Sequence, residues 1–276
     1  MATIGKMNHL QVVKLVDFGV FLDGGKFSTV LLPKRYVPDG CAIGDWLDVF
    51  LYRDSEDEII ATTLKPKVML GECAYLKVTD VNNAGAFLDW GLPKDLLVPY
   101  NEQHKPMEVA KSYVVTVQRD PQTDRLLASS KLNKYLSEAG PHFHPQQAVD
   151  LLICGRSDMG YKAVVNHTHL GLIFRDDAFK PLRYGQSMQG YIKGVRADGK
   201  LDLSLQLPAG AARKDLAEQI IAFLESQGGT STLTDKAAPD DIYHHFNVSK
   251  KNYKKALGAL FKQKRILIED DKITLL

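Results

Sequence analysis

The 276-residue sequence has no long apolar run and few cysteines. No stretch approaches the roughly 18 apolar residues of a membrane-spanning helix, and the first residues lack the apolar segment of a signal peptide. The three cysteines, Cys41, Cys73 and Cys154, are odd in number and far apart, a pattern typical of reduced thiols. We therefore expect a cytoplasmic protein that makes no membrane contact.

Motifs for catalysis or for cofactor binding are also scarce. The sequence lacks a glycine loop of the Walker or dinucleotide type, and it has no Cys-x-x-Cys or His-x-x-x-His pair. His142 with His144, and His167 with His169, could each place two imidazoles together, but no further ligands accompany them. The acidic run 54–58 falls in an expected turn. We predict that the protein is not an enzyme and holds no metal or cofactor.

A large excess of one charge is lacking too. The chain carries 35 Lys and Arg against 33 Asp and Glu, a formal net charge of +2, so no domain-wide basic signal indicates nucleic-acid binding. The charge is uneven, with a net −2 over 1–66, 0 over 67–144, and +2 over each of 145–208 and 209–276. A polyanion would be attracted more to the C-terminal half.

What the sequence does contain is an internal repeat, which should be interpreted before other features. The run 20–25, with 30–33 after it, returns 66 residues later as 86–91 with 96–99. At the same offset Arg53-Asp54 meets Arg119-Asp120, and the segment 60–63 meets 126–129. We interpret this match as gapless.

A weaker third copy follows at an offset of 141 from the first. Gly160 then meets Gly19, Leu172 meets Leu31, and Leu201 meets Ile60. Each copy alternates short β-rich runs with turn signals, and the strands of the first are expected at 9–16, 19–23, 29–32, 46–52 and 59–64. Five short strands in such a repeat indicate a small antiparallel barrel of the oligonucleotide-binding (OB-fold) type.

After residue 210 the apolar period changes from 2 to 3.6. Leu216, Ile220, Phe223 and Leu224 share one helical face. Asp240 can cap a short second helix and Ser249 a third. The expected apolar stripe of the third helix comprises Tyr253, Ala256, Leu257, Leu260 and Phe261, and a terminal hairpin follows at 266–275.

Three helices and a hairpin predict a winged helix. The predicted fold class is therefore mostly β with an α+β tail, three tandem five-stranded OB-fold barrels being followed by the winged-helix domain. The expected domains are 1–66, 67–144 with a linker at its end, 145–210 and 211–276.

Aromatic residues in the repeated motif are the first candidate contacts. If Val20 and Leu22 face the core, alternation places Phe21 on the outer face, near Phe18. Two exposed aromatic rings can stack on bases, because every base has a π-face. Phe87 takes the place of Phe21 in the second copy. The alternative is that these rings only cover the barrel or pack on a neighbouring domain.

The pattern 17–23, with Gly44-Asp45 and the last strand after it, resembles the ribosomal-protein S-one RNA-binding repeat. Three such repeats and a winged helix resemble the bacterial conserved-virulence-factor-B family of RNA-binding regulators. The resemblance covers nearly the whole chain. It implies an RNA face built from two aromatics, a histidine on the third strand, and an acidic and a basic residue around the last turn.

These implied positions are only partly filled. The aromatics match at Phe18 and Phe21 in the first copy and at Phe87 in the second. The acidic and basic turn residues match at Asp120 and Arg125 in the second copy, whereas Asp54 and Glu58 occupy these two positions in the first. The histidine is missing, because Leu32, Val98 and Ile173 occupy its place. In the third copy Lys162, beside Tyr161, replaces the second aromatic, and Lys200 stands at the basic position. Basic and aromatic residues also interleave there: Tyr161, Lys162, Phe174, Arg175, Lys180, Arg183, Tyr184, Tyr191, Lys193 and Arg196.

The third expected helix is the second candidate. Lys250 and Lys254 are four residues apart, as are Lys251 and Lys255, so the four lysines spread over one exposed flank. Such a flank suits phosphate contacts, although a solvated helix face or a protein-docking surface would look the same in the sequence.

We hypothesise a non-catalytic protein that binds single-stranded RNA and regulates gene expression after transcription, with the third barrel and the winged helix contributing most. The alternatives are a transcription regulator that binds duplex DNA through the winged helix, and a scaffold that docks on ribosomes or other proteins. The sequence does not indicate the oligomeric state.

Overall fold

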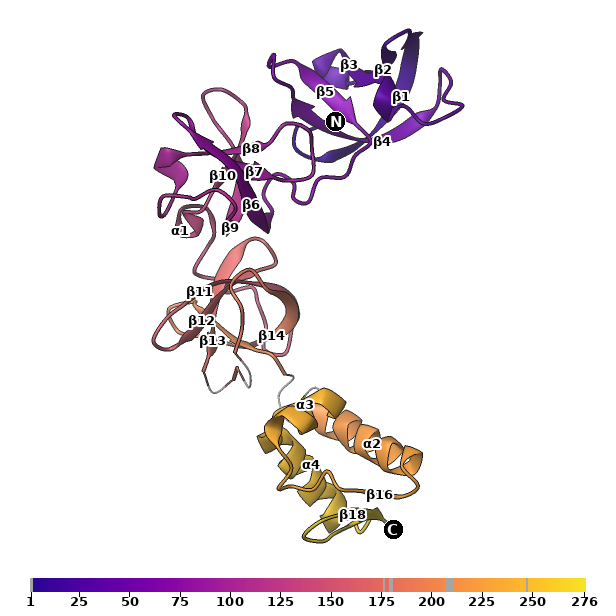
Figure 1. Ribbon diagram of the computed structural model, residues 1–276, viewed down its shortest axis with the longest axis vertical. Helices are drawn as coiled ribbons and strands as arrows, with labels where there is room; N and C mark the ends of the chain where they lie inside the picture. The colour runs from indigo at the N-terminus through magenta and orange to yellow at the C-terminus, as the bar shows by residue number, and fades with distance from the viewer. Residues whose placement is uncertain (1, 176, 179–180, 207–210, 247) are drawn as a thin grey trace.

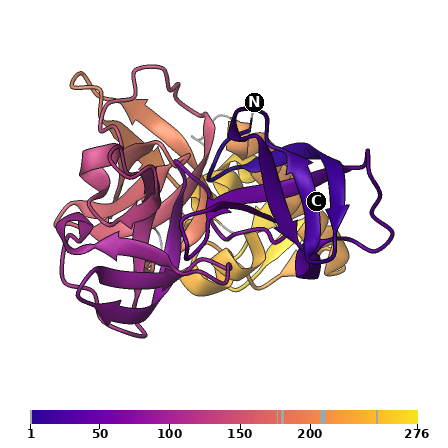
Figure 2. The same cartoon turned by 90° about the horizontal axis from the view of Figure 1, so that it is seen from above.

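The computed structural model describes residues 2–175, 177–178, 181–206, 211–246 and 248–276. The fold is mostly β, with three five-stranded barrels followed by a winged helix, as the repeat pattern predicts. The four units follow one another along the long axis of the molecule (Figure 1). Seen from above, the first barrel overlaps the winged helix, whereas the second and third barrels lie to one side (Figure 2). The expected boundary at residue 210 falls on 207–210, outside the described residues.

The first barrel is closed, with the strand order β1-β2-β3-β5-β4. Its strands are β1 (Met7–Val16), β2 (Gly19–Asp23), β3 (Thr29–Pro33), β4 (Trp46–Arg53) and β5 (Ile59–Thr62). Short 3-10 turns, η1 (Gly25–Phe27) and η2 (Lys34–Tyr36), flank β3. Alternation along β2 buries Val20 and Leu22 in the core and directs Phe21 outward, as predicted.

The second and third barrels repeat this order. The second consists of β6 (Cys73–Asn82), β7 (Gly85–Asp89), β8 (Leu96–Pro99), β9 (Ser112–Arg119) and β10 (Leu126–Ser129), with η3 (Tyr100–Glu102) after β8. The helical turn α1 (Leu132–Tyr135) leads to the third, which consists of β11 (Ala148–Arg156), β12 (Gly160–Val165), β13 (His169–Phe174), β14 (Ser187–Val195) and β15 (Leu201–Ser204). The third barrel is closed like the first.

One glycine recurs at the start of the second strand of every barrel for a steric reason. A Cβ on Gly19, Gly85 or Gly160 would lie 2.2, 2.2 and 2.0 Å from a carbonyl oxygen of the adjacent strand. The preceding strand of each barrel also carries a bulge, at Val12/Lys14, Val78/Asp80 and Ile153/Gly155. The three units are thus copies of one backbone, and the glycine lets two of its strands approach closely.

The repeat is not gapless, however, and the sequence alignment of the last strand was wrong by one residue. Leu51 pairs with Ala61 in the first barrel, and its counterpart Val117 pairs with Ala128 in the second, an offset of 67 in β10. The turn between β9 and β10 holds the extra residue.

The third barrel shifts likewise. Leu31 lies beside Ile60, whereas Leu172 lies beside Asp202 instead of the expected Leu201. A bulge between Ile192 and Gly194 in β14 adds the residue, because a bulged strand opposes two residues to one.

The fourth strand of the first barrel is buried on both faces. Val49 and Leu51 belong to the core of the first barrel. Phe50 and Tyr52, on the other face, belong to the core cluster of the second barrel, and the Phe50 ring lies 5.7 Å from that of Trp90, edge to face. The continuous apolar run 49–52 thus serves two cores.

The corresponding strand β9 is also buried on both faces, between the second and third barrels. Val115 and Val117 face the second core, whereas Val114 packs with Leu152 and Val164 of the third barrel. Polar contacts accompany this junction: the amide of Cys73 donates to Nδ1 of His167 (3.0 Å), and the amide of Val114 donates to the hydroxyl of Tyr184 (2.9 Å).

The winged helix contains α2 (Ala211–Ser226), β16 (Thr230–Ser231), α3 (Pro239–Phe246), α4 (Lys250–Lys262), β17 (Ile266–Ile268) and β18 (Ile273–Leu275). Ser249 caps α4 as predicted, its side chain accepting from the amide of Asn252. Asp240 does not precede α3 but lies in its first turn, because Pro239 takes the first position, which proline favours. The expected stripe of α4 is buried except for Phe261, which is 50% exposed.

The recurrent glycine generates a stability prediction. Gly160→Ala would push a methyl group to within 2.0 Å of the Ile173 carbonyl oxygen, so we expect it to lower the free energy of unfolding by roughly 2–3 kcal/mol. Gly194→Ala in the same barrel is the matched control, since its Cβ would meet no atom within 4 Å. Urea unfolding of both variants checks this, and equal stability would contradict the steric role.

Candidate nucleic-acid interface

The last hairpin of each barrel brings two residues together at the same backbone position. The backbone amide of the first residue donates to the backbone carbonyl of the second in each barrel. The pairs are Asp54 and Glu58 (3.0 Å), Asp120 and Arg125 (2.9 Å), and Arg196 and Lys200 (2.9 Å). Arg125 and Lys200 are therefore structurally equivalent, and Glu58 stands in the same place in the first barrel. The pair is acidic in the first barrel, mixed in the second and doubly basic in the third.

The outward residue of the second strand changes in parallel. It is Phe21 in the first barrel, Phe87 in the second and Lys162 in the third. The Phe18 and Phe21 rings lie 6.3 Å apart, edge to face, and Phe18 is 60% exposed. Phe18 corresponds by position to Ala84 and Met159. The aromatic platform is thus complete only in the first barrel.

The third-strand positions compared for a histidine do not lie on this face. Leu32, Val98 and Ile173 are fully buried core residues. The outward residues of β3, β8 and β13 are their neighbours Leu31, Leu97 and Leu172, which pair with the second strand beside Phe21, Phe87 and Lys162. The residues that follow, Pro33, Pro99 and Phe174, are also only partly buried, so neither outward neighbour is the histidine that the family resemblance implies.

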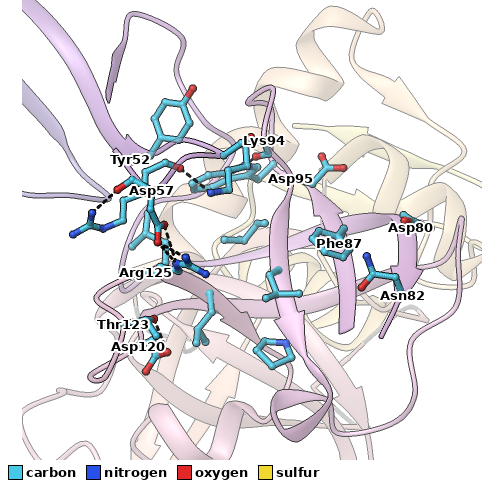
Figure 3. A pocket seen from close by; sticks show the side chains of 18 residues that line it. Tyr52, Asp57, Asp80, Asn82, Phe87, Lys94, Asp95, Asp120, Thr123 and Arg125 are labelled. Carbon is cyan, nitrogen blue, oxygen red and sulfur yellow. Dashed lines mark hydrogen bonds and ion pairs between the residues drawn. The ribbon is translucent and has the colours of Figure 1, made fainter. Parts of the chain in front are cut away.

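In the second barrel the predicted residues Phe87, Asp120 and Arg125 line one groove of ≈ 670 Å³ (Figure 3). Trp90, Lys94 and the outward Leu97 line it from the same barrel, and Tyr52, Arg53 and Asp57 from the first. The groove thus lies between two barrels. Its lining carries the cations Arg53, Lys94 and Arg125 against the carboxylates Asp57, Asp80, Asp95 and Asp120.

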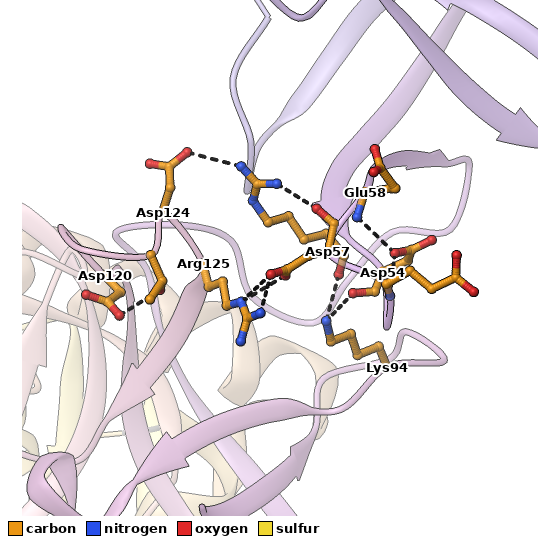
Figure 4. Close-up of polar contacts among 10 residues, drawn as sticks. Asp54, Asp57, Glu58, Lys94, Asp120, Asp124 and Arg125 are labelled. Atoms are coloured by element: carbon orange, nitrogen blue, oxygen red, sulfur yellow. Dashed lines mark hydrogen bonds and ion pairs between the residues drawn. The ribbon is translucent and has the colours of Figure 1, made fainter.

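Ion pairs and hydrogen bonds across this junction occupy the cations of the groove (Figure 4). Nε of Arg125 donates to both carboxylate oxygens of Asp57 (2.8 and 2.9 Å), and Arg53 of the first barrel reaches Asp124 of the second (3.7 Å). The hydrogen bond from Arg125 lowers the pKa of Asp57. Lys94 donates to the carbonyl of Arg53 (3.2 Å), and its burial lowers its pKa.

The carboxylate of Asp120 stabilises its own turn by hydrogen bonds, whether or not a ligand is bound. Its carboxylate accepts from the amide of Gln122 (3.0 Å) and from the Thr123 hydroxyl (2.7 Å), and the latter bond lowers its pKa. Asp54 accepts from the amides of Glu56 and Glu58 in the same way. The hydrogen bonds of the turn therefore explain an aspartate at this position without any contact to RNA.

The third barrel presents the more cationic groove, of ≈ 270 Å³. Lys162, Arg196 and Lys200 line it with a single carboxylate, that of Glu138. Arg196 pairs with Asp202 (2.7 Å), whereas the contact of Lys200 with Asp198 is longer (3.6 Å) and both side chains are half exposed. Lys162 makes no ion pair with any described residue. The exposed Met159 and the outward Leu172 give the groove its apolar part.

Two other predicted residues of this barrel lie apart from that groove. Tyr161 packs against the core, with the guanidinium of Arg156 5.7 Å from its ring centre. Lys193 sits in the bulge of β14, pairs with Asp177 (2.7 Å) and lies near the Phe174 ring. Lys180, one of the interleaved basic residues, is outside the described residues.

The four lysines of α4 fall into two pairs. Nζ of Lys250 donates to the carbonyls of Lys236 and Ala237 (3.1 and 2.8 Å), and Lys254 pairs with Asp235 (3.2 Å). Lys251 and Lys255 are exposed and make no ion pair within the described ranges. The first pair holds the segment 235–237 on the helix, and only the second is free for a ligand.

Comparison with known proteins identifies the family. Residues 4–64 match the model of the S1 domain, and residues 218–275 match that of the CvfB-like winged helix domain. The conserved virulence factor B of Staphylococcus epidermidis (strain ATCC 12228) is 30% identical over 298 residues, which cover 99% of this chain and 94% of that protein. The chain belongs to the conserved virulence factor B family.

Two further proteins are similar to this chain. The uncharacterized protein YitL of Bacillus subtilis (strain 168) is 27% identical, with 96% of this chain and 91% of that protein covered. A crystal structure of a multidomain protein with nucleic acid binding domains from Streptococcus pneumoniae is 25% identical and covers 99% of this chain and 98% of that one, with a TM-score of 0.42.

The S1 domain and the winged helix are nucleic-acid-binding types of domain, and neither matched family is one of enzymes. Within the described ranges, no three His, Cys, Asp or Glu residues form a group that could hold a metal ion. None of the helices in the described part of the chain is both long and apolar enough to cross a membrane.

The clamp on Arg125 can be tested by removing its partner. Asp57→Asn keeps a residue that tolerates the left-handed backbone at this position (φ 71) but frees Arg125 for phosphate. We expect tighter binding of single-stranded RNA and a log K against log salt slope steeper by about 0.7, the value of one phosphate contact.

Glu56→Gln is the matched control, since it removes one exposed charge from the same turn without touching Arg125. Fluorescence anisotropy over a salt series measures both variants. Equal slopes for the two would show that Arg125 does not contact the ligand.

Proposed function

We propose that the protein binds single-stranded RNA without catalysing a reaction on it, and that it regulates gene expression after transcription, in the cytoplasm. The observation that carries the proposal is the equivalent outer face of the three barrels. Its last hairpin changes from acidic through mixed to doubly basic, and its second-strand residue from phenylalanine to lysine. A face whose charge changes in this way from barrel to barrel suits a flexible RNA strand that contacts several units.

The chemistry of each position assigns it a role. Phe18, Phe21 and Phe87 offer rings on which unpaired bases stack, and stacking accepts any base. Lys162 and Lys200 in the third barrel, and Lys251 and Lys255 on α4, meet phosphates. The third barrel and the winged helix dominate the affinity, because their cations are less occupied by carboxylates than those of the groove beside Arg125.

Several weak contacts suffice because they are linked. Once one barrel holds a strand, the next contact is intramolecular and benefits from a high effective concentration. The packed junctions at Phe50 and Val114 keep the barrels at fixed spacing, so a bound strand finds its next site without ordering a linker. High affinity at any single barrel is therefore unnecessary.

Two double variants of the full chain test the division of roles. Lys162→Ala/Lys200→Ala removes two exposed cations from the third barrel, and we expect weaker binding of a uridine oligonucleotide and a salt slope shallower by about 1.4, the value of two phosphates. Phe18→Ala/Phe21→Ala removes stacking but no charge, so we expect a smaller loss of affinity with an unchanged slope.

Competition at fixed salt separates RNA from duplex DNA. Single-stranded RNA is expected to displace a labelled RNA at lower concentration than duplex DNA of equal length. Preferential displacement by the duplex would favour a transcription regulator instead. A larger loss from the Phe18/Phe21 variant than from the Lys162/Lys200 variant would overturn the dominance of the C-terminal half.

A further inference from the structure

Gly258 in the middle of α4 has no structural reason within the described part of the chain. Glycine is a poor helix residue, and a Cβ at this position would meet no heavy atom within 4 Å. Its neighbours along the chain, Leu257 and Ala259, continue a regular helix. A glycine that weakens its own helix without relieving a clash leaves bare backbone open to a ligand that approaches from outside.

The side chains around Gly258 form a ring of three cations and one aromatic. On a helix surface the neighbours of a residue are those three and four positions away, which for Gly258 are Lys254, Lys255, Phe261 and Lys262. All four are exposed, and Phe261 is half exposed although it was expected in the apolar stripe. The result is an open notch with helix backbone as its floor.

We infer that this notch binds one nucleotide of single-stranded RNA, the base stacking on Phe261 and the phosphate lying over Gly258 between Lys255 and Lys262. The inference rests on the proposed function, since its ligand is the RNA. The exposed ring supplies a sequence-tolerant stacking surface. The missing side chain lets the phosphate approach the helix, where two ammonium groups neutralise it.

The distribution of charge around α4 favours one strand over a duplex. Lys251, Lys255, Gly258 and Lys262 succeed one another along a single row of the helix, about 16 Å long at 1.5 Å per residue. The neighbouring edge is closed, because Lys250 and Lys254 hold the segment 235–237. One free row of cations matches one sugar-phosphate backbone.

The hairpin of β17 and β18, which forms the wing, adds charge of the wrong sign for a duplex. Its turn, residues 269–272, contains Glu269, Asp270 and Asp271 with one lysine. Asp270 pairs with Lys236 (2.6 Å), so the wing and the closed edge of α4 are joined through adjacent residues, 235 and 236. A duplex that lay on α4 and reached the wing would meet these carboxylates, whereas a single strand along the free row avoids them.

Two substitutions in the full chain test the notch. Gly258→Gln fills it, and we expect a higher Tm, because glutamine favours the helix, together with weaker binding of a uridine oligonucleotide. A merely structural glycine predicts the opposite change in Tm and no specific loss of binding. Phe261→Ala should weaken binding about 5- to 150-fold, the range for one lost base–aromatic stack, and Phe261→Tyr should restore it.

Matched controls place equal changes elsewhere on the winged helix. Ala222→Gln adds bulk at an exposed position of α2, and Leu267→Ala removes an exposed apolar side chain from β17. Both should bind the oligonucleotide like the wild type. The measurement is fluorescence anisotropy at one salt concentration, with the Tm of each variant from thermal unfolding followed by circular dichroism.

The outcomes separate this inference from the proposed function. Wild-type affinity of both Gly258→Gln and Phe261→Ala would overturn the notch and leave RNA binding by the barrels intact. A wild-type chain that does not bind the oligonucleotide would overturn both. Equal losses for the oligonucleotide and for duplex DNA in Phe261→Ala would overturn the preference for a single strand.

Discussion

Burial of both faces of the fourth strand is the constraint on which the arrangement of the barrels depends. In a free five-stranded barrel this strand would show one face to the core and the other to water. Here Phe50 and Tyr52 on β4 enter the core of the second barrel instead, and Val114 on β9 joins an apolar cluster between the second and third barrels. Full burial of such a side chain contributes roughly 1.5–3 kcal/mol, so each junction stabilises two barrels and fixes their mutual position. The corresponding strand β14 carries the exposed Lys193 near its end, and the described residues show no barrel covering it.

The same constraint explains why equivalent positions differ in chemistry. Docking of the first barrel on the second brings the last hairpins of both to one place, and Asp57 then meets Arg125. A carboxylate there stabilises the junction but competes with any phosphate. The last hairpin of the third barrel makes no ion pair with another barrel in the described ranges, so Lys200 keeps only a long contact with its neighbour Asp198. Divergence of the repeats is thus partly a consequence of their packing.

Sequence reasoning recovered the elements because their signals are local. Alternation placed Val20 and Leu22 inside and Phe21 outside, and a capping serine placed the start of α4. It failed where one residue changes the phase: an extra turn residue shifted β10, and the bulge at Lys193 shifted β15. The histidine comparison used an inward position for the same reason, since a shift of one residue exchanges the inner Leu32 for an outward neighbour, Leu31 or Pro33.

Contacts between units were beyond any local signal. The run 49–52 predicts a strand, but nothing in it tells which partner covers the second face. Phe261 shows the converse. It has the spacing of the buried stripe, yet half of it is exposed. The apolar period alone does not show where the packed surface of a helix ends. The sequence could predict which residues line the grooves. It could not predict the residues with which Arg125, Lys250 and Lys254 pair.

The separation of aromatics and cations along the chain has a consequence for how a bound strand responds to salt. In the proposed binding mode, stacking on Phe18, Phe21 and Phe87 would involve no counterion release, whereas phosphate contacts to Lys162, Lys200, Lys251 and Lys255 would. Rising ionic strength therefore weakens the C-terminal contacts first, and the N-terminal barrels retain their share. In this division a bound RNA strand is held mainly by the aromatic faces at high salt, so the main contacts shift toward the N-terminal barrels without any change in the arrangement of the units.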